Sequence, residues 1–253
     1  MTIGTVIHIF SRCPSTNDLA KRLAQGGAAA GTVVIAEEQT GGRGTKGRIW
    51  HSPHGRGLYA SVILRPRRAD LSLLPLAAGV ACLEAIGEAT GLEAALEWPN
   101  DIVWKRRKLG GILCEGEFLG NAVSFAVLGI GLNISQRRGD FPAALRRKAT
   151  SLWLALGREV DKAVFEKALW PALDRWYATW ARGRREEIVR AYESKLTIPI
   201  GTVVNVRREG ASLRGIFRGI DHLARLQVEQ QGEKVLLSPA EILAIDYNEG
   251  APS

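Results

Sequence analysis

Residues 39–50, with the sequence QTGGRGTKGRIW, combine glycines and cations in a way that favours anion binding. Four glycines and the three cations Arg43, Lys46 and Arg48 fall within eight residues, and Trp50 follows. Glycine allows successive backbone N–H groups to point into one concavity, and the surrounding cations suit a phosphate or an activated carboxylate. A basic surface turn has the same composition, so this loop alone leaves an anion site and a surface turn equally open.

A second compact motif, Trp-Pro-Asn-Asp at residues 98–101, places an amide beside a carboxylate. Asn100 and Asp101 can hold Mg²⁺, a ribose or a phosphate-bound water. An Asx turn requires the same two residue types, and on the motif alone the turn is the favoured interpretation. The basic run at 105–108 predicts a hairpin tip, and the paired glycines after Lys108 let a ligand approach the backbone closely.

Two further polar groups stand at the ends of predicted elements. Ser15, Thr16 and Asn17 precede apolar residues at helical spacing, so a helix N-cap is an adequate explanation of all three. Asn133 follows an apolar run at 123–130 that predicts a buried strand, which places an amide at a strand terminus.

The elements that must position these residues alternate between strands and helices in the first part of the chain. A strand is expected at 32–36, directly before the glycine loop, and an apolar helix at 71–90 that ends at Gly91. The stretch 160–180 has amphipathic spacing, and Pro171 is expected to break it into two helices. After residue 197 the pattern changes to short strands, which predicts a small β-barrel or SH3-like module with strands at 202–206, 213–220, 225–229 and 234–237.

The composition predicts an ordered protein of the cytoplasm. The 253 residues are 46% hydrophobic and 24% charged, which favours one large domain, or a large and a small one, over disorder. No signal peptide and no run of 18 apolar residues is present, so a cytoplasmic location without membrane contact is expected. Cys13, Cys82 and Cys114 form no CxxC pair, and His51 and His54 lack partners for a zinc set, so no structural metal is expected.

The net charge of +8 comes from short basic runs spread along the chain. A basic surface of this kind serves a nucleic acid, an acidic protein partner or a phosphate-bearing substrate, or it is simply a solvated face. No recognition-helix, zinc-finger or RNA-binding aromatic pattern accompanies these runs, so a nucleic acid is the least favoured partner.

The motifs occur in the order that characterises the biotin protein ligases, which this chain resembles from about residue 6 to residue 245. The resemblance implies an α+β fold, with a catalytic domain of mixed β-sheet like that of class II aminoacyl-tRNA synthetases over residues 1–197. A small C-terminal SH3-like β-barrel is implied over residues 198–253. The stretches that carry the resemblance are 15–17, 39–50, 57–61, 98–101, 108–115 and 129–133.

The resemblance also implies a two-step, ATP-dependent ligase reaction. Biotin is activated with ATP and Mg²⁺ as biotinyl-5′-AMP, and is then transferred to a lysine of the biotin carboxyl carrier domain of a carboxylase. Arg43 and Lys108 are implied as catalytic residues, because two anions must be brought together. The implied biotin-binding residues are Ser15, Thr16, Asn17, Gln39, Gly42, Arg43, Gly44, Thr45, Lys108 and Gly111, the implied ATP-binding residues are Arg43, Arg48, Trp50, Asn100 and Asn133, and the implied Mg²⁺ ligand is Asp101.

The sequence departs from the family pattern in several places. Many relatives carry a DNA-binding winged helix before the catalytic domain, whereas this chain begins at the first catalytic strand, so it resembles the monofunctional group and no DNA partner is expected. Thr45 stands where the family usually has Arg, and we expect looser retention of the adenylate unless Lys46 or another cation compensates. Glu97 stands where relatives commonly have Lys, which removes a cation near the ATP mouth. The hairpin at 221–225 lacks the glycine that relatives commonly have there.

Two other functions remain open on the sequence. A lipoate or octanoate ligase has the same catalytic fold, although the full glycine-arginine loop and the Trp-Pro-Asn-Asp motif favour biotin. A non-catalytic sensor of biotin or biotinyl-5′-AMP would bind its ligand without transfer, although Arg43 and Lys108 are both retained. Carrier domains of the family are typically acidic and a basic face would attract them, and the resemblance also allows a homodimer through the catalytic sheet.

Overall fold

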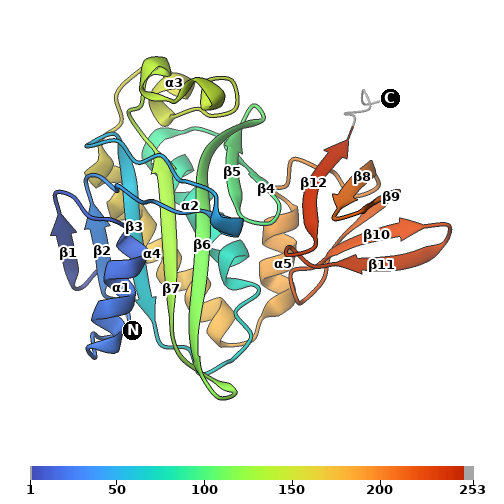
Figure 1. The fold of residues 1–253 in the computed structure, drawn as a ribbon, viewed down its shortest axis with the longest axis horizontal. Helices are drawn as coiled ribbons and strands as arrows, with labels where there is room; N and C mark the ends of the chain where they lie inside the picture. Colours follow the sequence, from blue (N-terminus) through green and yellow to red (C-terminus); the bar gives the residue numbers. More distant parts are fainter. Residues whose placement is uncertain (1, 248–253) are drawn as a thin grey trace.

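The computed structural model describes residues 2–247, which form two β-sheets and five α-helices (Figure 1). The larger sheet has seven strands in the order β1-β2-β3-β7-β6-β5-β4, and the edge strand β1 runs parallel to β2. The other neighbouring strands of this sheet are antiparallel. The strands are β1 (Ile7–Phe10), β2 (Val33–Ala36), β3 (Gly57–Leu64), β4 (Ala95–Glu97), β5 (Asp101–Trp104), β6 (Arg107–Leu119) and β7 (Ala122–Asn133).

The helices cover the two faces of this sheet unequally (Figure 1). On one face, α2 and α4 share a core with alternate residues of β3, such as Leu58 and Val62. On the other face, Ala20 and Ala24 of the short helix α1 cluster with Ile63 and leave the rest of that face to loops. The helices are α1 (Thr16–Gln25), α2 (Leu74–Thr90), α3 (Leu152–Leu156), α4 (Lys162–Ala181) and α5 (Arg185–Glu193).

Residues 74–83 of helix α2 are all apolar because this part lies between the sheet and α4, whereas its two acidic residues, Glu84 and Glu88, are exposed. It ends at Gly91, whose φ of 75° is left-handed and whose N–H donates to the Gly87 carbonyl. This confirms the helix end that the sequence predicts. In residues 2–247, no helix is both long enough and apolar enough to span a membrane.

The predicted break at Pro171 is wrong, because α4 runs without interruption from Lys162 to Ala181. Proline removes one backbone donor and crowds the preceding turn. Pro171 and Lys167, whose carbonyl loses that donor, both lie on the exposed side of the helix, so solvent can satisfy the carbonyl. On the opposite side, Phe165 and Leu169 are fully buried in the core and hold the helix in place.

The C-terminal part of the chain forms a second sheet of five antiparallel strands in the order β11-β10-β9-β8-β12. The sequence pattern predicts four of these strands and misses β12. Within the described residues the edge strands β11 and β12 do not pair, so the architecture is an open sheet and the SH3-like barrel is not confirmed. The strands are β8 (Val203–Arg208), β9 (Ala211–Ile220), β10 (Leu226–Gln230), β11 (Glu233–Leu237) and β12 (Ile242–Tyr247).

The predicted domain boundary at residue 197 crosses a continuous apolar core. Phe217 and Leu226 of the second sheet belong to the same buried cluster as the residues of α2 and α4. The Trp98 indole also donates to the Ala224 carbonyl across the boundary (3.1 Å). The division into two domains therefore stays a prediction, and Met1 and residues 248–253 of the two predicted domains lie outside the described residues.

Candidate active site

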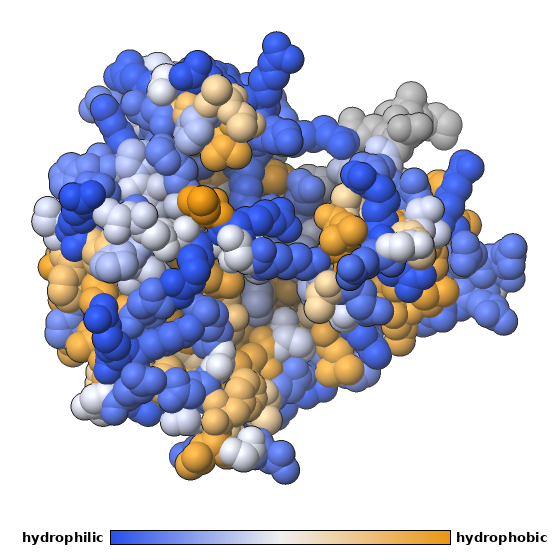
Figure 2. Space-filling model, viewed as in Figure 1, coloured by the Kyte–Doolittle hydropathy of each residue, from blue (hydrophilic) through white to orange (hydrophobic). Residues whose placement is uncertain are grey.

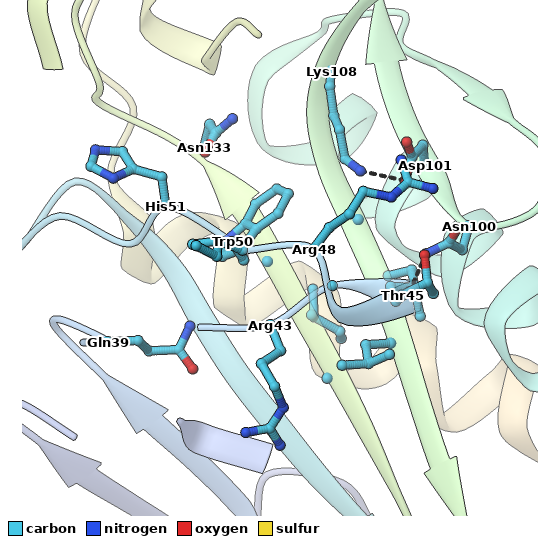
Figure 3. Close-up of a pocket in the computed structure, with 18 of the residues that line it drawn as sticks. Gln39, Arg43, Thr45, Arg48, Trp50, His51, Asn100, Asp101, Lys108 and Asn133 are labelled. Carbon is cyan, nitrogen blue, oxygen red and sulfur yellow. Dashed lines mark hydrogen bonds and ion pairs between the residues drawn. The ribbon is translucent and has the colours of Figure 1, made fainter. Parts of the chain in front are cut away.

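The face of the larger sheet that α1 leaves open carries a cavity of about 380 Å³ (Figure 3). In its floor, Gly111 of β6 pairs with Gly131 of β7, and Leu113 pairs with Gly129. Directly paired residues share one face of a sheet, and the glycines let side chains that line the cavity pack directly on the strands, as the Trp50 ring does at Gly131. The cavity is lined by Ser15, Thr16, Asn17, Gln39, Arg43, Gly44, Thr45, Arg48, Ile49, Trp50, His51, Ala60, Asn100, Asp101, Lys108, Gly111, Ile112, Leu113, Gly129, Ile130, Gly131, Asn133, Phe141, Leu145 and Lys148.

Every residue predicted for the site lines this cavity except Gly42. Gly42 lies behind the wall, where an added Cβ would come within 2.6 Å of the Trp50 carbonyl oxygen. The Trp50 N–H donates to the Gly42 carbonyl (2.9 Å) and the Gly44 N–H to the Arg48 carbonyl (2.7 Å), so the loop is a tight hairpin. Gly42 therefore allows the two strands of this hairpin to lie close together. The ligand roles of the other residues stay predictions.

At the α1 end of the cavity, a buried network of uncharged groups surrounds Thr16 and Asn17. Gln39 Oε1 accepts from the backbone N–H of Thr16 (2.8 Å) and from its hydroxyl (3.1 Å). Ser61 Oγ donates to Asn17 Oδ1 (2.6 Å) and lies 2.8 Å from Thr16 Oγ1. Ser15 is also buried, and its hydroxyl makes no cap bond to α1, so helix capping does not explain this side chain.

Glu115 of β6 links this end of the cavity to α1 through two side-chain hydrogen bonds. Its Oε2 accepts from Asn17 Nδ2 (2.6 Å) and its Oε1 from Lys21 Nζ (2.7 Å). Partial burial raises the pKa of Glu115, but the bonds from Lys21 and Asn17 outweigh burial and hold it below its ordinary value. At Gly129, an added Cβ would overlap the Asn17 side-chain oxygen, so only glycine allows α1 to sit this close to β7.

At the β5–β6 end of the cavity the groups are charged. Lys108 Nζ lies 2.7 Å from Asp101 Oδ1, and the side chains are 36% and 25% exposed. Lys108 Nζ also lies 5.5 Å from the centre of the Trp50 ring. Arg48 reaches toward Asp101 from the glycine loop (Figure 3), so two cations and one carboxylate meet at this end.

The two predicted asparagines are held by backbone partners across neighbouring segments. Asn100 Nδ2 donates to the Ile112 carbonyl (2.6 Å), so its amide spans to β6 instead of forming the local bond of an Asx turn. Asn133 Nδ2 donates to the Thr150 carbonyl (2.9 Å), and its Oδ1 accepts from Gln136 (2.9 Å). Asn133 therefore fixes both ends of the segment 136–150, which covers the cavity.

The guanidinium of Arg43 points away from Lys108 and Arg48 (Figure 3). It pairs with Asp18 of α1, at 2.5 and 2.7 Å. The hydrogen bonds from Arg43 hold the pKa of Asp18 below its usual value, although partial burial opposes them. Arg43 lines the cavity, but the sequence does not predict this carboxylate partner.

Comparison with known proteins assigns this site to a family. The sequence profile of the Biotin/lipoate A/B protein ligase family matches residues 9–133. The chain is 36% identical over 230 residues to the bifunctional ligase/repressor BirA of Bacillus subtilis, covering 88% of this chain and 70% of that protein. It is 33% identical over 246 residues to the biotin–[acetyl-CoA-carboxylase] ligase of Mycobacterium tuberculosis, covering 94% of this chain and 88% of that protein. The chain belongs to the biotin protein ligase family.

The fold agrees with this family. The biotin protein ligase of Aquifex aeolicus, solved in complex with biotin and ATP, superimposes with a TM-score of 0.83 at 26% identity, over 96% of this chain and 100% of that chain. The biotin protein ligase of Leishmania major in complex with biotinyl-5-AMP superimposes with a TM-score of 0.65 at 25% identity, over 95% and 99% of the two chains. The mixed α+β architecture is therefore that of the biotin protein ligases.

Eleven lining residues are not among the predicted site residues, and four of these, His51, Phe141, Leu145 and Lys148, also lie outside every motif. Phe141, Leu145 and Lys148 come from the covering segment, and His51 Nε2 lies 2.8 Å from the Asp140 carbonyl oxygen of that segment. The segment reaches the site through long-range bonds, such as that from Lys108 N to the Lys148 carbonyl (2.8 Å). Lys148 ends a short basic run in the sequence, and this run is the only signal that marks it.

A second cavity, of about 300 Å³, adjoins the first between the glycine loop and β12. The two cavities share Thr45, Arg48, Asn100 and Asp101. Figure 2 shows the surface hollowed between the large sheet and the C-terminal strands. The second cavity is also lined by Lys46, Glu97, Trp98, Pro99, Ile198, Pro239, Ala240, Ile242, Leu243, Ala244, Ile245 and Tyr247.

This second cavity bears on the family departures at Thr45 and Glu97, which both line it. The Lys46 ammonium donates to the Ile242 carbonyl of β12, so Lys46 faces the second cavity and not the first. It is therefore badly placed to replace the charge that Thr45 lacks, whereas Arg48 lines both cavities. Partial burial and the neighbouring Asp101 carboxylate raise the pKa of Glu97, so a carboxylate at this position is disfavoured electrostatically.

Proposed function

We propose that this protein is an ATP-dependent ligase that activates biotin as biotinyl-5′-AMP and transfers it to a lysine of a biotin carboxyl carrier domain. The observation that carries the proposal is a single cavity with a buried, uncharged polar end and a cationic end. Biotin has the same asymmetry, with a neutral ureido head and a carboxylate tail. The relatives named biotin–[acetyl-CoA-carboxylase] ligase support the choice of reaction.

The neutral head of biotin binds at the α1 end in this proposal. A ureido group presents one acceptor and two donors, and Ser15, Thr16, Asn17 and Gln39 offer both kinds of partner. The Ser15 hydroxyl is not used in capping α1 and is available to the ligand. The tail then runs over Gly111, beside the Trp50 ring that covers Gly131, toward Lys108.

In the first step, a biotin carboxylate oxygen attacks the α-phosphorus of ATP, and pyrophosphate leaves with the electron pair of the broken P–O bond. Both reactants are anions, so the barrier falls only if cations flank the reacting centre. Lys108 and Arg48 supply this charge at the cationic end, where the Lys108 ammonium pairs with Asp101. Arg43 adds a third cation once its side chain turns into the cavity.

In the second step, the acceptor lysine attacks the acyl carbon of the mixed anhydride as a neutral amine. The acyl C–O bond breaks, AMP leaves with the electron pair, and the amide nitrogen loses a proton. The net charge of +8 favours encounter with an acidic carrier domain.

ATP and Mg²⁺ have a compatible set of residues. Trp50, Phe141 and Leu145 provide apolar surface for a base, and the Trp50 indole N–H is buried without a partner among residues 2–247. The described residues contain no group of three His, Cys, Asp or Glu side chains arranged to hold a metal ion alone. Mg²⁺ usually binds through one or two carboxylates together with substrate phosphates, and Asp101 fits that mode. A bound Mg²⁺ would neutralise charge on the phosphates of ATP.

Residues 1–197 form the catalytic domain in this proposal, and residues 198–253 form an SH3-like domain. The role proposed for the second domain is to support the glycine loop through the contact of Lys46 with the Ile242 carbonyl. The first chemical step does not require contacts between this domain and the carrier domain.

The proposal is tested by incubating the protein with biotin, ATP, Mg²⁺ and a purified acidic carrier domain, and measuring biotin on the carrier lysine by mass spectrometry. We expect transfer that depends on both ATP and biotin, and biotin-dependent exchange of pyrophosphate into ATP. Exchange supported by lipoate or octanoate instead would favour the lipoate ligase alternative. Binding of biotin without exchange or transfer would favour a sensor.

A further inference from the structure

Arg43 and Asp18 form a two-pronged ion pair at the edge of the first cavity. Arg43 Nη1 donates to Asp18 Oδ2 (2.7 Å), and Nη2 donates to Asp18 Oδ1 (2.5 Å). Pairing of this kind fixes the direction of the guanidinium as well as its charge. Arg43 lines the cavity but Asp18 does not, so the pair draws the cationic end of Arg43 out of the cavity (Figure 3).

A second carboxylate lies near Arg43 but is already engaged. Glu115 Oε2 is 3.9 Å from Arg43 Nη2, which is beyond hydrogen-bond distance. Its two oxygens already accept from Lys21 and Asn17. Within residues 2–247, Asp18 is therefore the carboxylate that bonds Arg43 directly.

The backbone of the glycine loop does not depend on this ion pair. The Gly41 N–H donates to the Pro14 carbonyl (2.8 Å), and two further backbone bonds close the loop on itself. These bonds keep the Cα of Arg43 in place whether or not Asp18 is engaged. Both side chains are 38% exposed, and an exposed pair is weak enough for another anion to replace.

We propose that Asp18 is a positioning residue that holds Arg43 out of the cavity until the carboxylate of biotin, or the phosphate of its adenylate, replaces Asp18 as the partner of the guanidinium. This inference rests on the proposed function, because that function supplies the anion. Arg43 then turns about its side-chain bonds into the cavity, while the loop backbone stays in place. The exchange makes the cationic end of the site complete only when the acid substrate is present.

The test compares the affinity of wild type and Asp18→Asn for two ligands by calorimetry. Asparagine removes the negative charge and one of the two acceptors, so Arg43 is free before the ligand arrives. We expect Asp18→Asn to bind biotin more tightly by about two- to fivefold, which is the range of an exposed ion pair. Biotinol, in which an alcohol replaces the carboxylate, offers no anion to Arg43 and should bind both proteins equally.

Two controls separate this exchange from a general change in stability. Glu117→Gln removes a carboxylate from the same face of β6, where its partner is Gln25, and should leave the affinity for biotin unchanged. In the Arg43→Ala background, Asp18→Asn should have no effect on biotin binding. If Asp18→Asn folds poorly, Asp18→Ser removes the same charge and should give the same increase in affinity.

An unchanged or weaker affinity of Asp18→Asn for biotin would overturn the inference. An equal gain for biotin and biotinol would do the same, as would a gain that persists without Arg43. These results differ from failure of the proposed function, in which wild type itself shows no biotin binding and no pyrophosphate exchange.

Discussion

At the α1 end of the cavity, Thr16, Asn17 and Ser61 are almost completely buried and bond to one another without any formal charge between them. At the β5–β6 end, Lys108 and Asp101 form an ion pair that remains partly open to solvent. Neutral groups can be buried at low cost when each has a hydrogen-bond partner, whereas buried charges lose much more hydration. The first end can therefore be fixed before a ligand binds, and the second must stay hydrated and able to change partners.

This difference separates recognition from chemistry within one cavity. The rigid end identifies a small neutral head, since its donors and acceptors cannot move to suit another ligand. The charged end has partners to exchange, and the Asp101–Lys108 pair is one that an incoming anion can disturb. Substitutions at the two ends should accordingly change different measurable quantities.

The largest effect is expected for Lys108→Met. Removing the ammonium takes away charge where phosphate charge develops, and loss of one such group lowers a rate by about 100- to 1,000-fold. The turnover rate of biotin-dependent pyrophosphate exchange should fall by this factor, while biotin affinity measured by calorimetry should change far less.

Lys105→Met is the matched control for Lys108. Lys105 stands at the exposed hairpin tip over the Trp104 ring and does not line the cavity. The Lys105→Met variant should exchange pyrophosphate at the wild-type rate. If the exchange rate of Lys108→Met were within threefold of wild type, the charged end of the cavity would have no part in the chemical step.

The next effect is expected at the rigid end for Ser61→Ala. The change leaves the Asn17 side-chain oxygen without the Ser61 donor in a buried site, which costs about 1–3 kcal/mol. The free energy of unfolding, measured with urea, should fall by this amount, and biotin should bind more weakly. Turnover at saturating biotin should stay close to wild type.

Ser124→Ala provides the comparison for Ser61. Ser124 lies on an exposed part of β7 and is distant in sequence from the network. This variant should keep the stability and biotin affinity of wild type. If Ser61→Ala instead lowered turnover and left affinity intact, the division between the two ends would be wrong.

A smaller effect is expected for Thr45→Arg, at the junction of the two cavities. The new guanidinium can pair with the phosphate of biotinyl-5′-AMP, and an exposed pair of this kind is worth up to about fivefold. Release of free biotinyl-5′-AMP, followed by rapid filtration, should slow by that factor. Because Lys46 is occupied by the Ile242 carbonyl, it offers little compensation in wild type. Equal release rates would show that Thr45 does not limit retention.

The smallest effect is expected for Glu97→Gln. Partial burial and Asp101 raise the pKa of Glu97, so its ionised form weakens folding at neutral pH. The glutamine variant should gain at most about 0.5 kcal/mol above the folded-state pKa, because the side chain keeps enough contact with solvent to screen its charge. This gain should vanish below about pH 4, where the carboxyl is protonated in the folded and unfolded states alike. Thermal unfolding from pH 3.5 to 8 measures it. A constant difference at all pH values would contradict the electrostatic cause.

Much of the larger sheet and most of the cavity follow from local sequence patterns. Buried strands such as β2 are continuous apolar runs, and glycine at 91 marks the end of α2. Ser15, Asn100 and Lys108 reach one cavity because each stands at the end of an element or beside one. Element ends are visible in sequence because caps and turns use distinctive residues.

The remaining features depend on contacts between distant residues. Pro171 is tolerated because the tertiary packing of α4 decides which side faces solvent. β12 is an edge strand with an irregular register near Ile242, and its pairing with β8 has no local signal. The partner of Arg43 lies 25 residues away in sequence, and the direction of a long side chain depends on such partners.

The contact of Lys46 with the Ile242 carbonyl has a consequence for motion in the native protein. Local opening of a protein occurs in cooperative groups of residues, and an anchor shared by two segments tends to place both in one group. The middle of the glycine loop is thus fastened to β12, an edge strand with one neighbour, and not to the core strands beneath it. Amide hydrogen exchange at residues 45–47 should therefore follow the exchange of β12, and fraying of the C-terminal sheet should reach the reacting groups before the core of the protein loosens.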